Sequence, residues 1–109
     1  MTAADGRHLR RMLDCIAGMR SESVSLVQGA DSLLFLRNAL EHAEQSWVDE
    51  LTSHLATLEF AGLASPEQVT AMGSKYAEVV AGALDALEDL VRGRFPDGVP
   101  PAGDADSKL

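Results

Sequence analysis

Hydrophobic residues recur along most of the chain at steps of three and four, the spacing that places side chains on one face of an α-helix. The pattern predicts helices over residues 8–19, 24–41, 47–61 and 66–92. The chain contains neither a β-hairpin signature nor an internal repeat. We therefore expect an all-α fold, a small helical bundle of three to four helices around one core.

The third and fourth predicted helices have the clearest apolar stripes. Positions 47, 51, 55 and 58 align on one face of the third helix, and the fourth helix continues the pattern for more than six turns. The second helix is apolar on more than one side, because Phe35 and Val24 project away from its main face and Arg37 falls within that face. Such a helix is either central in the bundle or presents an apolar patch. The main face of the second helix consists of Leu26, Val27, Ala30, Leu33, Leu34 and Leu40. The apolar stripe of the fourth helix consists of Val69, Met72, Tyr76, Val79, Ala83, Leu87 and Leu90.

The start of the fourth helix carries the strongest local signal in the chain. In Ser65-Pro66-Glu67-Gln68, serine is suited to cap the helix, proline to occupy its first position, and glutamine to return the capping bond. Gly62 just before this segment predicts the end of the third helix.

The other helix starts are marked by serines. Ser21 or Ser23 is expected to cap the second helix, and Ser46 with Asp49 resembles a capping arrangement for the third. The alternative at the latter position is one unbroken helix that includes both the second and the third segment.

A change of composition after Arg92 predicts the end of the folded domain. Residues 93–109 are rich in glycine, proline and aspartate, a composition that buries too little apolar area to offset the entropy of an ordered chain. We expect one helical domain over residues 1–92 and a disordered tail over 93–109.

The overall charge restricts the classes of partner. With a formal net charge of −8, the chain would approach nucleic acid or an anionic membrane surface against repulsion, so neither is an expected partner. Cys15 is the only cysteine, which excludes an internal disulfide, and the N-terminal residues lack the build of a signal peptide. Apolar runs are too short to cross a bilayer, and we expect a cytoplasmic location.

Few side chains offer catalytic or metal-binding chemistry. His54 lies on the apolar face of the third helix with Trp47, and Glu50 precedes it by one turn. The chain contains no Glu-x-x-His, HExxH, CxxC, GxSxG or glycine-rich phosphate loop. We expect no metal, no cofactor and no enzymatic activity, and keep a small-molecule site at these three residues as a third hypothesis. Cys15 is expected to be a small buried hydrophobe, and Arg37 to pair with Glu41, one turn on.

Negative charge is concentrated in the middle of the chain. Segment 1–20 has four arginines and two aspartates, whereas segment 21–65 has one arginine and seven acidic residues. Glu41, Glu44, Asp49 and Glu50, called here the acidic corner, gather around the turn before the third helix. They form either a solvated corner or, with the apolar Phe35, a docking site for a basic protein. The leading hypothesis is a non-enzymatic protein-interaction module, and the alternative is a structural homodimer formed through the second or fourth helix.

One segment resembles a known group of proteins. Ala39-Leu40-Glu41, with Trp47 six residues past the glutamate and large apolar residues at 51, 55 and 58, is similar to a family of short uncharacterised bacterial helical proteins. The resemblance covers residues 24–60 and implies a helical fold without implying an activity. In size and charge the chain is also similar to toxin-immunity proteins and antitoxins, which bind a partner's active surface.

Overall fold

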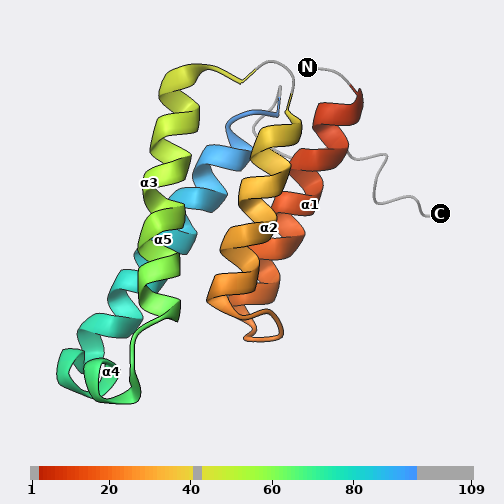
Figure 1. The fold of residues 1–109 in the computed structure, drawn as a ribbon. Coiled ribbons are helices and arrows are strands. Elements are labelled where there is room, and N and C mark those ends of the chain that lie inside the picture. The colour runs from red at the N-terminus through yellow and green to blue at the C-terminus, as the bar shows by residue number, and fades with distance from the viewer. Residues whose placement is uncertain (1–2, 41–42, 96–109) are drawn as a thin grey trace.

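The computed structural model describes residues 3–40 and 43–95, and all of its regular structure is helical. The helices are α1 (Ala3–Arg20), α2 (Leu26–Ala39), α3 (Gln45–Gly62), α4 (Pro66–Met72) and α5 (Ser74–Arg92) (Figure 1). The all-α prediction is confirmed, but the described part of the chain has five helices and not three to four.

The additional helix arises because the predicted helix 66–92 is broken at Gly73. Its φ of 59° lies in a region that L-residues rarely adopt, and its N–H donates to the carbonyls of Val69 and Thr70 to close α4. The predicted start at Ser65 is confirmed, with both bonds of the capping box to Gln68 present. The apolar stripes before and after Gly73 fall on the same helix face, so the sequence pattern does not show that the helix is broken there.

Two other predicted caps are wrong. Ser25 and not Ser21 or Ser23 caps α2, since its hydroxyl accepts from the N–H of residue 28. Helix α3 begins earlier than predicted, at Gln45, so Ser46 lies inside its first turn. The second and third helices are separate, because α2 ends at residue 39 and Leu40 has an extended backbone.

Four of the helices form an up-down bundle in which α1 packs on α2, α2 on α3, α3 on α5, and α5 back on α1 (Figure 1). This closed order explains why one apolar stripe on each helix is enough to build a common core. The short α4 packs only against α5 among the described helices. The core consists of Leu9, Met12, Ile16, Met19, Ala30, Leu33, Leu36, Trp47, Leu51, Leu55, Leu58, Ala83, Leu84, Leu87, Val91 and Phe95.

The buried face of α2 differs from the predicted one. Gly29, Leu33 and Leu36 are buried, whereas Leu34 is exposed. The cause is the close approach of α1: a Cβ on Gly29 would overlap the side chain of Met19, so the missing side chain lets the two helices touch there. This contact places the face of α2 that carries Gly29 toward the core.

The folded part also extends beyond the predicted boundary at residue 92. Phe95 is only 2% exposed and belongs to the core, so the core continues past the glycine that ends α5. Residues 96–109, the rest of the predicted disordered tail, lie outside the described residues.

Candidate interaction surfaces

The predicted acidic corner lies at the N-terminal end of α3. Glu44 immediately precedes the helix; its side chain is 79% exposed, and one carboxylate oxygen lies 3.7 Å from the guanidinium of Arg94. Asp49 accepts a hydrogen bond of 2.7 Å from the amide side chain one turn before it, and Glu50 is exposed on the same helix. These three carboxylates therefore share one end of the bundle, whereas Glu41 lies outside the described residues.

Large apolar side chains are exposed in several places. Phe35, the predicted apolar contact, is 72% exposed on α2. At the end of α3, Phe60 and Leu63 are exposed to a similar degree, and neither was among the predicted contact residues. Phe60 was detectable, because at 100° per residue it lies opposite the stripe of Leu51 and Leu58.

The residues of the third hypothesis have structural partners. His54 Nε2 lies 4.0 Å from a carboxylate oxygen of Glu50. Trp47 is nearly buried; its indole N–H donates to the carbonyl of Leu90 at 2.9 Å, and the guanidinium of Arg94 lies over its ring at 5.5 Å. Trp47 therefore ties α3 to the end of α5. Within residues 3–40 and 43–95 there is no group of three or more His, Cys, Asp or Glu side chains placed to hold a metal ion.

Arg37 and Cys15 are both engaged with their neighbours. The guanidinium of Arg37 donates to the hydroxyl of Thr52 at 2.6 Å and to the side-chain carbonyl of Asn38, at the edge of a hollow of about 380 Å³ between α2 and α3. Its predicted partner in the acidic corner lies outside the described residues. The thiol of Cys15 donates to the carbonyl of Gly29 at 3.4 Å, and burial raises its pKa.

A second hollow is an apolar groove that the hydrophobic pattern does not predict. It has a volume of about 630 Å³ and lies between the turn that joins α1 to α2 and the first half of α5. Ala77 and Ala81, one turn apart, form one wall; Val24 and Leu26 form the other. Leu84 is buried at its floor. We call this hollow the α5 groove.

The turn at the edge of the groove contains an unusual residue. After α1, the N–H of Glu22 donates to the carbonyl of Met19 and the N–H of Ser23 to that of Gly18, the two bonds of a Schellman motif. Glu22 occupies the left-handed position of this motif with a φ of 65°, where glycine is usual. Its exposed carboxylate therefore lines the α5 groove at a conformational cost.

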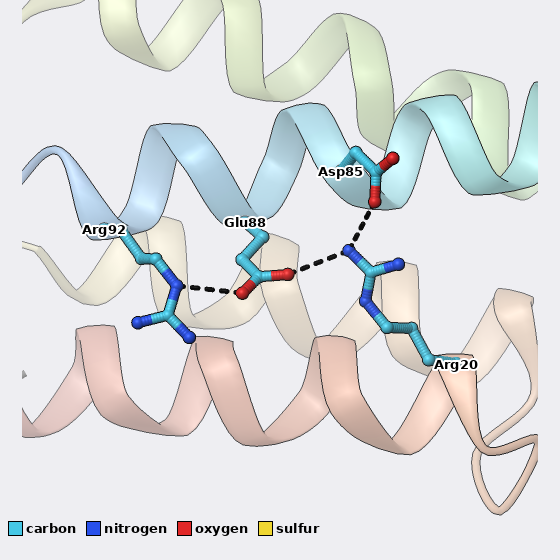
Figure 2. A network of polar contacts seen from close by, with 4 residues as sticks. All are labelled: Arg20, Asp85, Glu88 and Arg92. Carbon is cyan, nitrogen blue, oxygen red and sulfur yellow. Dashed lines mark hydrogen bonds and ion pairs between the residues drawn. The ribbon is translucent and has the colours of Figure 1, made fainter. Parts of the chain in front are cut away.

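A network of charges closes one end of the groove. Figure 2 shows Arg20 of α1 between Asp85 and Glu88 of α5, at 2.7 and 2.8 Å, with Arg92 also bonded to Glu88 at 2.8 Å. The hydrogen bonds from Arg92 and Arg20 lower the pKa of Glu88. The one arginine that lines the groove is therefore already paired with two carboxylates.

No protein-family model, no curated protein and no solved structure matches this chain. None of the helices in the described part has the length and apolar character needed to cross a membrane.

Proposed function

We propose that the protein is a non-enzymatic interaction module that binds a basic partner protein. The observation that carries the proposal is the exposure of acidic and large apolar side chains on the same small bundle. Glu44, Asp49 and Glu50 are exposed at one end of α3, and Phe35 is exposed on α2. Acidic side chains steer a basic partner into contact, and aromatic side chains supply the buried area that holds it.

The charge of the whole chain supports the same partner class. A formal net charge of −8 on 109 residues attracts basic proteins over distances of a Debye length, about 8 Å at physiological salt. Immunity proteins and antitoxins of similar size and charge work in this way, which is an analogy of class only.

The test compares charge reversal at the acidic corner with charge reversal elsewhere. Glu44, Asp49 and Glu50 are all changed to lysine in one variant; Asp14 and Asp31, exposed on α1 and α2, are changed to lysine in the control. Each protein is immobilised, basic proteins retained from native extract are identified, and the affinity of each purified protein is then measured by titration.

We expect a basic protein that binds the wild type and the control with similar affinity and the corner variant at least about tenfold more weakly. Equal affinity for all three proteins would remove the acidic corner from the interface. Retention of acidic or neutral proteins alone would contradict the proposal as a whole.

Self-association is a second candidate function, favoured by Phe60 and Leu63, which are 77% and 74% exposed at the end of α3. Adjacent exposed apolar side chains of this size are typical of interfaces. Light scattering over a range of concentrations tests it. This function is supported if the wild type is a dimer and the substitutions Phe60→Ser and Leu63→Ser dissociate it. A wild type that is monomeric at all concentrations would exclude it.

A further inference from the structure

The α5 groove exists because α5 extends further than α1 at this end of the bundle. Arg20, the last residue of α1, lies beside Asp85, so the first half of α5 continues past the end of α1, and Figure 1 shows it running obliquely toward α4. In this region the side of α5 that faces α1 elsewhere has no helix beside it. Ala77 and Ala81 lie on that side and are exposed, although Leu84, one turn further on, is buried. The groove is thus a place in the bundle from which one neighbouring helix is missing.

The shape of the groove fits a helix. Small side chains one turn apart let a second helix approach closely, at an axial distance of about 8 Å. The groove follows α5 from Tyr76 to Leu84, or slightly more than two turns. Two turns of a partner helix present apolar side chains at positions i, i+3 or i+4, and i+7, the spacing with which amphipathic helices enter grooves.

The first half of α5, which forms one wall of the groove, is fixed by contacts within the protein. The hydroxyl of Tyr76 donates to the carbonyl of Ala61 at 2.9 Å, which ties the start of α5 to the end of α3. Gly62 packs closely against Leu26 and Val27, so the end of α3 also touches the start of α2. Because these two contacts already order the walls of the groove, ligand binding costs little additional conformational entropy.

The edges of the groove are acidic. Glu22 lines one edge, and it has no ion-pair partner among the described side chains. On α5, Glu78 and Asp85 are seven positions apart and therefore share the exposed face next to Ala81. Arg20, at the closed end, is occupied by Asp85 and its neighbour Glu88.

This charge pattern selects the occupant. A helix with an apolar face flanked by lysine or arginine would place its apolar side chains in the groove and its cations near the exposed carboxylates of Glu22 and Glu78. A second copy of this chain carries a net charge of −8 and meets repulsion at the same edges.

We propose that the α5 groove binds the apolar face of a basic amphipathic helix from a partner protein. The inference rests on the proposed function, because it names the part of the basic partner that is recognised, and it locates that recognition away from the acidic corner.

The probe for the test is a fluorescein-labelled synthetic peptide of about 15 residues with leucines at helical spacing and lysines on both flanks. Its control is a peptide of the same composition in which the leucines are dispersed around the helix. Binding is measured by fluorescence anisotropy at about 0.15 M salt. Circular dichroism of each protein variant checks that the helical bundle is intact.

Three variants separate the groove from other surfaces. Ala81→Trp fills the groove, and Ala56→Trp adds the same bulk at an exposed position on the outer side of α3. Glu22→Gln removes one edge charge and adds no bulk. We expect Ala81→Trp to weaken peptide binding at least about tenfold, Glu22→Gln to weaken it about threefold, and Ala56→Trp to change it less than about twofold.

The outcomes also distinguish this inference from the proposed function. Equal binding of the two peptides, or equal effects of the two tryptophans, would overturn the groove as the site. If triple lysine substitution of Glu44, Asp49 and Glu50 abolishes peptide binding and Ala81→Trp does not, the inference is wrong and the proposed function stands. A dimer that Ala81→Trp dissociates, with no peptide bound, would show that a second copy occupies the groove.

Discussion

Replacement of Glu22 by glycine should stabilise the protein, although Glu22 belongs to the proposed binding groove. Its φ of 65° places an L-residue where Cβ crowds the following carbonyl, at a cost of about 1–2 kcal/mol. Glycine avoids this cost but loses more backbone entropy on folding, about 0.5–1 kcal/mol. Removal of a carboxylate just past the C-terminus of α1 adds a few tenths of a kcal/mol. The expected net gain is about 0.5–1 kcal/mol.

Urea denaturation followed by circular dichroism measures this gain, and thermal denaturation should show a rise in Tm of about 2–6 °C. Glu22→Ala is the matched control, because alanine also lacks the carboxylate but retains the crowded backbone. We expect Glu22→Ala to gain at most a few tenths of a kcal/mol. If Glu22→Gly is no more stable than Glu22→Ala, the left-handed conformation costs nothing and the reasoning is refuted.

The other predictions concern packing and acid stability. Gly29→Ala should destabilise the protein by about 1 kcal/mol despite the helix propensity of alanine, because its Cβ would displace the buried Met19. Gly82→Ala, with open space around the new Cβ, should stabilise it by about 0.5–1 kcal/mol, and urea midpoints compare the two. Because Glu88 has a lowered pKa, it contributes stability above its ordinary value of 4.5, and this contribution is lost as pH falls through the lower folded value. The wild type should therefore lose stability more steeply than Glu88→Gln in urea titrations below about pH 5, and parallel curves would contradict this.

The sequence predicts those parts of the fold that depend on local periodicity. The stripe of Leu51, Leu55 and Leu58 is buried as expected, since three neighbours on one helix face meet the same core. The break at Gly73 does not follow from the sequence pattern, because glycine is also tolerated within helices. The burial of Leu36 in place of Leu34 depends on the contact of α1 with α2, which no pattern within α2 contains.

The candidate surfaces also differ in how far they can be predicted from the sequence. Glu44, Asp49 and Glu50 are close in sequence, so their common position at one end of α3 follows from helix geometry alone. The α5 groove joins side chains more than fifty positions apart, such as Val24 and Ala77. It exists because α1 ends where α5 continues, a relation between helix ends that the hydrophobic pattern of neither helix expresses.

The most direct test of recognition in the groove is a map of amide chemical shifts in the isotopically labelled full chain as the basic amphipathic peptide is added. We predict that the largest changes fall in two segments, residues 22–26 and 76–84, which line opposite walls of the groove. Changes concentrated at residues 44–50, or spread evenly over the bundle, would contradict the account.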